Sequence, residues 1–265
     1  MNKSLVLMLA SVMVLAAVPA FALEEMTMTP AADVALEEKL GQYLPADLVF
    51  TDENGSRVIL KDLIDKPAVI APVYLGCTHT CPLLLSGLAQ TLGKLELVKP
   101  GKDFSVITVS FDEKDTPALA ADRKRNYVKA VGRPFPADAW KFLTGDSAEI
   151  GKLTEAIGFR IQRDGKDFSH PISLVVVSSQ GRIVRYLEGV SFLPFEMTMA
   201  VNEAAEGRVG SARRKALMYC FSYDPAKKSY VFNVLKVTGT AMVLFVGAFM
   251  GYLVYSTKKG SKTGR

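Results

Sequence analysis

Two cysteines with a histidine between them are the residues of this chain best suited to chemistry. Cys77 and Cys81 lie in the stretch PVYLGCTHTCPLLLSGL, residues 72–88, and His79 stands between them. The whole chain holds three cysteines and two histidines, so this short stretch contains most of its soft metal ligands. A pair of thiols at this spacing could form a structural disulfide, a redox-active dithiol or half of a metal site.

The residues on either side of the pair predict a strand followed by a helix. The apolar run Ala68–Leu75 is typical of a central strand buried on both faces. Pro82, directly after Cys81, is typical of the first position of a helix. A helix N-terminus carries partial positive charge, so we expect the pKa of a cysteine there to be lowered. Open α/β sheets place their sites at such carboxyl ends of strands.

The spacing of the cysteines bears on which metal they could hold. Three residues separate them, one more than in the usual redox dithiol, and this wider loop suits two sulfurs that bind one ion. Thiolates favour Cu(I), zinc or iron–sulfur clusters. Clusters usually require four cysteines, which the chain lacks, and structural zinc requires four ligands. A metal site would therefore need a histidine, and His79 and His170 are the candidates.

The rest of the apolar pattern alternates between strands and helices, which predicts an α/β sheet with helices on its faces. Thr116 and Pro117 are a typical N-cap and first residue of a helix. Asp112, Glu113 and Asp115 just before them are expected to form an exposed loop. We predict strands at 68–75, 104–111, 172–178 and 182–187, and helices at 84–95, from 117, at 147–157 and at 193–205.

Both ends of the chain are typical of an exported membrane protein. Residues 1–22 combine a charged start, an apolar core and small residues before Ala22, as in a cleaved signal peptide. Residues 234–256 are predicted to form a transmembrane helix, since the apolar stretch Val237–Tyr255 approaches the roughly 20 residues that span a bilayer. Lysines and arginines in the tail 257–265 predict a cytoplasmic C-terminus, so the globular domain would lie on the periplasmic side of a bacterial inner membrane.

The charge balance gives no reason to expect a nucleic-acid partner. The formal net charge is +5, and Lys3 with the four basic residues of the tail accounts for all of it.

The predicted organisation leaves room for one domain between the two ends. A spacer at 23–40 precedes a domain at 41–207, and a connector at 208–233 carries Cys220. An odd number of cysteines in an exported chain indicates thiols kept for chemistry. Cys220 itself could be a buried apolar residue, an intermolecular bridge or an auxiliary thiol, and the sequence does not choose among these.

Several motifs together resemble the Sco/SenC family, which comprises thioredoxin-fold copper chaperones for cytochrome c oxidase. Between Gly41 and Ala205 the chain carries, in order, the Cys-x-x-x-Cys-Pro motif, FDEKDTP, FLTGDSAEIGKLTEAIGF, and a histidine before SLVVVSSQGRIVRYL. The resemblance implies a thioredoxin-like fold, a central sheet flanked by helices, with the C-terminal transmembrane helix as a variant arrangement. It also implies that Cys77, Cys81 and His170 bind copper.

The resemblance further implies a membrane-tethered chaperone that binds Cu(I) or Cu(II) and delivers it to the copper-receiving subunit of a respiratory oxidase. Oxidation of Cys77 and Cys81 to a disulfide would remove two ligands, so copper binding would require a thiol reductant as a further partner. The chain departs from the usual family pattern in its lead-in Tyr74-Leu75-Gly76, in the residues between the cysteines, and in Pro171 after the histidine.

Two enzyme classes remain as alternatives. Cys77 and Cys81 could be the catalytic pair of a thiol-disulfide oxidoreductase that reduces cysteines of an exported copper-site partner, and His170 would then be dispensable. A peroxiredoxin-like peroxidase shares the fold, but it would carry a threonine where this chain has Tyr74.

Overall fold

The computed structural model describes residues 35–165 and 167–209, two further strands, and several helical positions between 238 and 252. The two further strands are β10 (Phe221–Asp224) and β11 (Ser229–Phe232), which pair antiparallel within the predicted connector. The predicted signal peptide, Cys220 and most of the predicted transmembrane segment lie outside the described residues. Among the residues that are described, no helix combines the length and the apolar character needed to cross a membrane.

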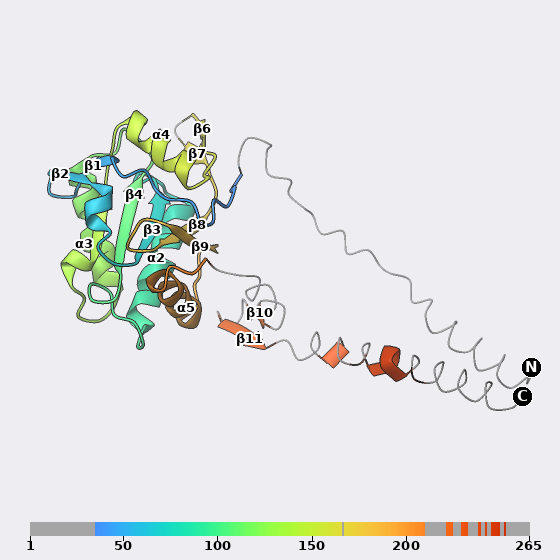
Figure 1. Cartoon of the computed structure of the whole chain (residues 1–265). Helices are drawn as coiled ribbons and strands as arrows, with labels where there is room; N and C mark the ends of the chain where they lie inside the picture. The colour runs from blue at the N-terminus through green and yellow to red at the C-terminus, as the bar shows by residue number, and fades with distance from the viewer. Residues whose placement is uncertain are drawn as a thin grey trace, which may run out of the picture. The chain divides into compact units, whose positions relative to one another are not determined.

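A five-stranded mixed sheet forms the centre of the domain (Figure 1). Its strand order is β5-β4-β3-β8-β9, in which β3, β4 and β5 are parallel, while β8 runs antiparallel to both β3 and β9. The carboxyl ends of β3, β4 and β5 therefore lie at the same edge as the amino end of β8. The strands are β3 (Ala68–Val73), β4 (Ser105–Ser110), β5 (Trp140–Leu143), β8 (Ser173–Val177) and β9 (Ile183–Glu188).

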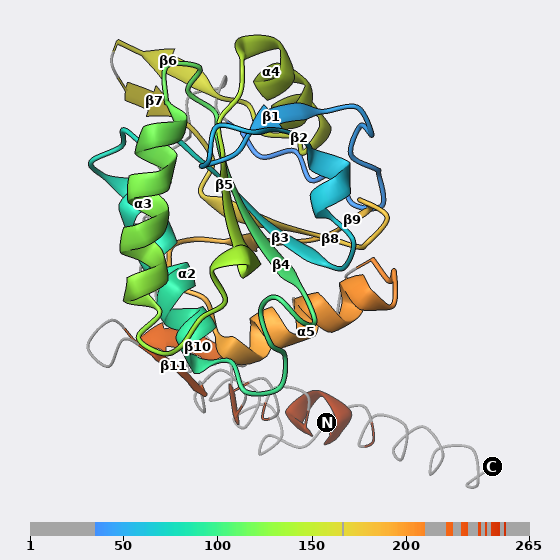
Figure 2. The same ribbon diagram turned by 90° about the vertical axis from the view of Figure 1, so that its left-hand side faces the viewer.

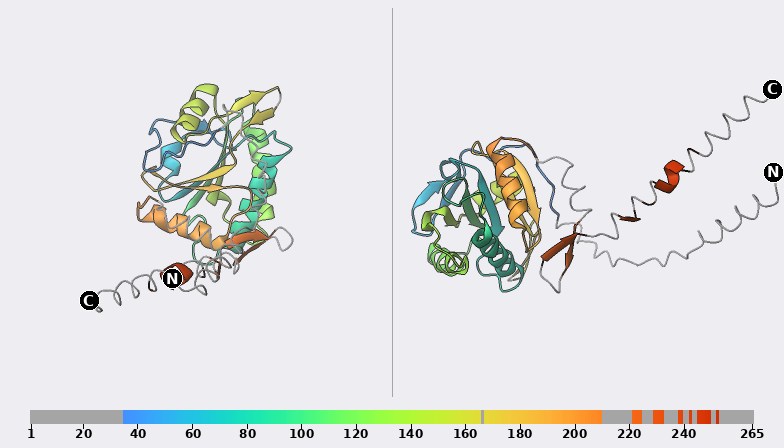
Figure 3. Two further views of the ribbon diagram at one scale, coloured as in Figure 1. Left: turned by 90° about the vertical axis from the view of Figure 1, so that its right-hand side faces the viewer. Right: turned by 90° about the horizontal axis from the view of Figure 1, so that it is seen from below.

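Helices make the connections that the parallel strands require. Helix α2 joins β3 to β4, α3 joins β4 to β5, and α2 packs against both α3 and α5. Figures 2 and 3 show α5 at the opposite end of the domain from α4 and the β6–β7 hairpin. The α-helices are α2 (Thr80–Lys94), α3 (Pro117–Ala130), α4 (Ser147–Ala156) and α5 (Pro194–Ala205), and two 3-10 helices are η1 (Leu60–Leu63) and η2 (Ala137–Ala139).

The predicted elements and the α/β architecture are confirmed. The four predicted strands are β3, β4, β8 and β9, and the four predicted helices are α2 to α5. Thr116 caps α3 as expected, because its hydroxyl accepts the N–H of Leu119 at 3.3 Å, and Pro117 is the first helical residue. The sequence analysis missed β5 and two short hairpins, β1–β2 (Val49–Thr51 and Arg57–Ile59) and β6–β7 (Gln162–Asp164 and Asp167–Ser169).

Proline in a central strand is explained by the register of β3. Pro72 has no N–H to donate, and a central strand normally needs donors on both sides. The pairing of β3 with β8 covers Ala68 to Ile70 only, so Pro72 lies beyond the last residue paired on that side. The sheet thus opens between β3 and β8 just before the cysteine motif.

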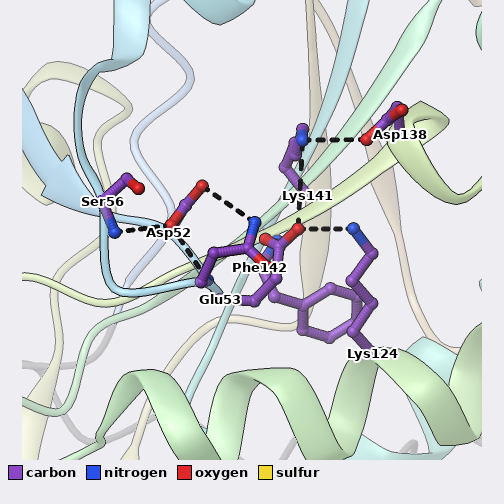
Figure 4. Close-up of polar contacts among 8 residues, drawn as sticks. Asp52, Glu53, Ser56, Lys124, Asp138, Lys141 and Phe142 are labelled. Atoms are coloured by element: carbon purple, nitrogen blue, oxygen red, sulfur yellow. Dashed lines mark hydrogen bonds and ion pairs between the residues drawn. The ribbon is translucent and has the colours of Figure 1, made fainter.

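The edge strand β5 is covered by a buried ion pair (Figure 4). Glu53, in the turn between β1 and β2, accepts the N–H of Phe142 at 3.0 Å through Oε2. Its Oε1 lies 2.5 Å from Nζ of Lys124 on α3 and 3.9 Å from Nζ of Lys141 on β5. Only 5% of the Glu53 side chain is exposed. This carboxylate therefore joins the hairpin, the edge strand and α3, and occupies an edge donor that could otherwise pair with another chain.

The opposite edge strand, β9, is covered by the residues that enter the domain. Gly41 donates its N–H to the carbonyl of Ile183, and Ile183 donates to the carbonyl of Gln42. Arg182 joins the N-terminal and C-terminal segments of the domain, since its guanidinium donates to the carbonyls of Gly41 and Gly207 at 3.2 and 3.3 Å. Within the described residues, part of each edge strand is thus covered.

Helix α2 lies very close to the loop that leads into α5. A Cβ added at Gly87 would lie 1.9 Å from the carbonyl oxygen of Val190. One turn further along the helix, Thr91 Oγ1 donates to the carbonyl of Phe192 at 2.9 Å. The glycine is therefore required by this close approach of backbone to backbone.

Loss of the Glu53 carboxylate should destabilise the domain strongly. We expect Glu53→Gln to lower the free energy of unfolding by about 3 kcal/mol, because Lys124, whose side chain is 13% exposed, would keep a charge without its partner. Urea unfolding of the full-length chain measures this change.

The matched control is Asp122→Asn, which breaks the exposed pair with Arg125 and should cost under about 1 kcal/mol. The double variant Glu53→Gln with Lys124→Met should recover part of the lost stability, since no uncompensated charge remains. Equal effects of Glu53→Gln and Asp122→Asn would contradict the assigned role.

Alanine should be unfavourable at Gly87 and favourable at a second helical glycine. Gly87→Ala should lower the melting temperature, because the methyl group forces α2 away from Val190. Gly151→Ala on α4 meets nothing within 4 Å and should stabilise by up to about 1 kcal/mol through helix propensity. Calorimetry on the two variants compares the same chemical change in two surroundings, and similar shifts would disprove the close packing at Gly87.

Candidate metal centre

Three distant parts of the chain meet at the carboxyl edge of the sheet. Tyr74 to Cys77 follow β3, Phe111 to Asp115 follow β4, and His170 precedes β8, which starts at this edge because it runs antiparallel to β3. This topology brings His170 to Cys81 although 89 residues separate them in sequence.

The two cysteines are free thiols and both are buried. Cys77 is 4% exposed and lies on the loop after β3, and Cys81 is 2% exposed in the first turn of α2. The helix begins at Thr80, so the expectation that Pro82 is its first residue was wrong. Pro82 still falls within the first turn, where the backbone N–H of a residue has no intrahelical acceptor.

The environments of the two thiols push their pKa values in opposite directions. Burial raises the pKa of Cys77, but the nearby Tyr74 hydroxyl, which also hydrogen-bonds Asp167 at 2.9 Å, the His79 N–H and Cys81 outweigh it, so the pKa of Cys77 is lowered. The His79 N–H lies 3.4 Å from the Cys77 sulfur. Burial raises the pKa of Cys81 well above its ordinary value, and the neighbouring Cys77 adds to this rise. The lowered pKa expected at the helix N-terminus is therefore wrong for Cys81, because desolvation dominates there.

His170 directs the lone pair of a ring nitrogen at Cys81. Its Nε2 lies 3.6 Å from the Cys81 sulfur, and its Nδ1 lies 2.8 Å from the carbonyl oxygen of Pro171. Because a carbonyl can only accept, Nδ1 carries the proton and Nε2 is left as the acceptor. Burial lowers the pKa of His170, which favours the neutral ring. A neutral imidazole oriented by a carbonyl is the form that binds metals.

His79, the other histidine candidate, has a different role. Its side chain is exposed, and its ring nitrogen Nδ1 lies 3.3 Å from the Thr78 hydroxyl. Its backbone is the part that contacts the site, through the N–H to Cys77. The structure thus brings His170, and not the His79 ring, to the cysteines.

The three predicted ligands are neighbours, but their donor atoms are not arranged around a common ion position. Cys77 contacts Cys81, and Cys81 contacts His170. Within the described part of the chain, no three histidine, cysteine or carboxylate side chains are close enough together to surround an ion. Binding at this place would therefore require a small movement of a side chain or of the loop that bears it.

Aromatic rings pack against His170. Phe111 and Tyr74 lie with their ring centroids 5.0 and 6.0 Å from that of the imidazole. Phe168, from the missed strand β7, packs against both rings at 5.3 and 5.0 Å. This aromatic cluster, Tyr74, Phe111, Phe168 and His170, keeps water from the imidazole and explains its lowered pKa.

The backbone of Leu75, two residues before Cys77, is held through both its N–H and its carbonyl. Asp115 Oδ2 accepts the N–H of Leu75 at 2.6 Å and the hydroxyl of Ser110 at 2.5 Å. Arg123 on α3 donates to the Leu75 carbonyl at 3.0 Å. Burial raises the pKa of Asp115, against the hydrogen bonds that lower it. These contacts fix the position at which the chain enters the cysteine loop.

The expectation of an exposed acidic loop is wrong for two of its three residues. Asp115 is partly buried under the cysteine loop, and Asp112 is 9% exposed and paired with Arg163. Glu113 is exposed as expected. The misleading signal was composition: three acids in five residues usually indicate solvent, but the end of a central strand turns two of them inward.

Comparisons with known proteins show the family and the fold of this chain. The family model SCO1/SenC matches residues 37–206. A crystal structure of a candidate electron transfer protein from Aquifex aeolicus VF5 matches with a TM-score of 0.57 and 35% identity, over 66% of this chain and 98% of that one. No protein in the search of curated proteins matches at a significant level.

More distant structures share the fold. Arabidopsis thaliana ScoI with copper bound matches with a TM-score of 0.51 and 19% identity, over 63% of this chain and 99% of that one. BsSco, described as having a disulfide switch and as a member of the Sco family of cytochrome c oxidase assembly proteins, matches with a TM-score of 0.50 and 22% identity, over 64% and 98%. Since the family model covers well over half of its residues, this chain belongs to the SCO1/SenC family.

Proposed function

We propose that this protein is a copper chaperone that binds copper through the sulfurs of Cys77 and Cys81 and through Nε2 of His170. The observation that carries the proposal is the approach of the His170 lone pair to the Cys81 sulfur, beside a second free thiol. Two thiolates and one imidazole form a soft donor set, which suits Cu(I). The copper-bound relatives of the same fold are consistent with this choice of metal.

The proposed site can accept copper and release it. Cys77 supplies the first thiolate, because its pKa is lowered. Cys81 is protonated at neutral pH and releases its proton when copper binds, so binding is coupled to pH. Three ligands leave coordination positions open, and a recipient site could take the ion by exchange of ligands one at a time. We propose a copper centre of a respiratory cytochrome c oxidase as the recipient.

A second candidate function is reduction of disulfides in an exported partner. It is favoured by the contrast between Cys77 and Cys81, since a thiol-disulfide exchange needs one thiolate to attack and a second thiol to resolve the mixed disulfide. Such an activity would use the same pair as copper binding, and the two functions differ in their dependence on His170.

We also propose that a C-terminal helix at 234–256 tethers the domain to the inner membrane, with the domain outside and residues 257–265 in the cytoplasm. The support comes from the apolar stretch Val237–Tyr255 and the lysines and arginine that follow it. The signal peptide at 1–22 belongs to the same proposal.

The copper proposal predicts a distinct pattern among four variants. In a Cys220→Ser background, the reduced full-length chain should bind one equivalent of Cu(I) in competition with a chelator. Cys77→Ser and Cys81→Ser should abolish tight binding, and His170→Ala should weaken it by at least about tenfold. His79→Ala is the matched control, and it should bind as the parent does because the His79 ring is exposed.

If His170→Ala binds Cu(I) as tightly as the parent, the proposed set of three ligands is excluded. If His170→Ala also retained the ability to reduce the disulfide of a test peptide, thiol-disulfide oxidoreductase would become the better-supported function.

The Tyr74 hydroxyl should set the pH at which Cys77 reacts. Because hydrogen bonding from Tyr74 lowers the pKa of Cys77, Tyr74→Phe should raise that pKa and shift the alkylation profile of Cys77 to higher pH. Peptide mass spectrometry after iodoacetamide treatment at several pH values measures the two cysteines separately. In the parent, Cys77 should react before Cys81 at neutral pH, and the reverse order would show that the assignment of the two thiols is wrong.

A further inference from the structure

His170 is carried by a hairpin that has few attachments to the domain. It lies one residue after β7, and the strands of the β6–β7 hairpin are largely exposed. Among the described residues, three hairpin side chains make hydrogen bonds, ion pairs or ring contacts with the rest of the domain. They are Arg163, Asp167 and Phe168. The position of the hairpin, and of the histidine that follows it, depends on these contacts.

Arg163 makes the attachment that joins the hairpin to the end of β4. Its Nη2 lies 2.9 Å from Asp112 Oδ1 and 2.9 Å from Glu113 Oε2. The Arg163 side chain is 32% exposed and that of Asp112 is 13% exposed, so solvent screens this pair less than an ordinary surface pair. One cation thus holds two successive acidic residues that directly follow Phe111.

The same guanidinium also holds a ring of the aromatic cluster. Its Cζ lies 4.2 Å from the centroid of the Phe168 ring, as in a cation–π contact. Phe168 in turn packs on Tyr74 and Phe111, and both of these contact the His170 ring. The guanidinium keeps its central carbon over the ring while a terminal nitrogen reaches both carboxylates, whereas a lysine ammonium is a single point charge without a planar group to lie on the ring.

We propose that Arg163 is a positioning residue for the metal centre: it fixes the β6–β7 hairpin to the end of β4 and thereby holds the His170 imidazole beside Cys81. The consequence for copper rests on the proposed function, but the positioning itself does not. Without Arg163, the side-chain attachments left among the described hairpin residues are the contacts of Phe168 and the hydrogen bond from the Tyr74 hydroxyl to Asp167 at 2.9 Å. All three ligands would then be present in the chain while the imidazole is no longer held in place.

Copper affinity tests the consequence. In the reduced full-length chain with Cys220→Ser, Arg163→Met should weaken Cu(I) binding about tenfold, as loss of a group that orients a ligand does. Arg163→Lys should recover little, since it restores charge without the planar fork. The matched control is Arg125→Met, which removes an exposed arginine paired with Asp122 and should leave binding unchanged.

A double-mutant cycle separates positioning from general damage. If Arg163 acts through His170, Arg163→Met should add no further loss of copper affinity in a His170→Ala background. An equal loss in both backgrounds would overturn the proposal, and so would parent-like affinity of Arg163→Met.

The positioning can also be measured without metal. The chain has two histidines, so its imidazole protons give two sets of NMR signals, which His170→Ala assigns. In the metal-free chain, Arg163→Met should weaken the nuclear Overhauser contacts between the His170 and Phe111 rings and leave the exposed His79 signals unchanged. Retained ring contacts would overturn the proposal whatever the copper result. If Arg163→Met loses these ring contacts and the parent binds no copper, the positioning role is supported and the copper function is rejected.

Discussion

The antiparallel pairing of β8 with β3 is the constraint on which the candidate site depends. If β8 ran parallel to β3, the residues before it would lie at the amino edge of the sheet, far from Cys77 and Cys81. Because β8 is antiparallel and its pairing with β3 stops at Ile70, the segment that bears His170 crosses the end of β3 and meets the cysteine loop. The ion pair of Glu53 and the entry segment bonded to Ile183 cover part of the two edge strands.

Burial then gives the site its chemical asymmetry. Cys81 and His170 are both desolvated, which favours their neutral forms, and a neutral thiol beside a neutral imidazole forms an uncharged pair. Cys77 lies within reach of the Tyr74 hydroxyl and the His79 N–H, so it bears the thiolate more readily. A site with one ready thiolate and one protonated thiol avoids two adjacent negative charges in a buried space, and it acquires the second charge only when a cation arrives.

Sequence patterns were sufficient to predict the elements that have a long apolar pattern or a typical capping residue. The apolar run of β3, the leucine spacing of α2 and the Thr116 cap each depend on local chemistry, and each was found. The three-residue strands of β6 and β7 carry no such signal, because neither face of that hairpin is buried enough to impose an alternation. The inward turn of Asp112 and Asp115 was missed for a related reason: it depends on Leu75 and Arg163, which are distant in sequence. Cys81 shows the same limit of sequence patterns. Pro82 indicates that Cys81 lies near the start of a helix, but nothing local indicates that the thiol is buried.

The two sides of the site are held by different kinds of contact, and this difference bears on how the proposed copper site would release its ion. On the cysteine side, Asp115 accepts the Leu75 N–H, Arg123 donates to the Leu75 carbonyl, and α2 is packed against α3 and α5. On the histidine side, an exposed hairpin is attached through Arg163, Asp167 and Phe168. Moving the imidazole with its hairpin therefore leaves the packed helices in place, whereas moving Cys81 displaces the first turn of α2. If copper leaves by ligand exchange, the imidazole is the ligand that can depart first, which would leave the two sulfurs to present the ion to an incoming donor.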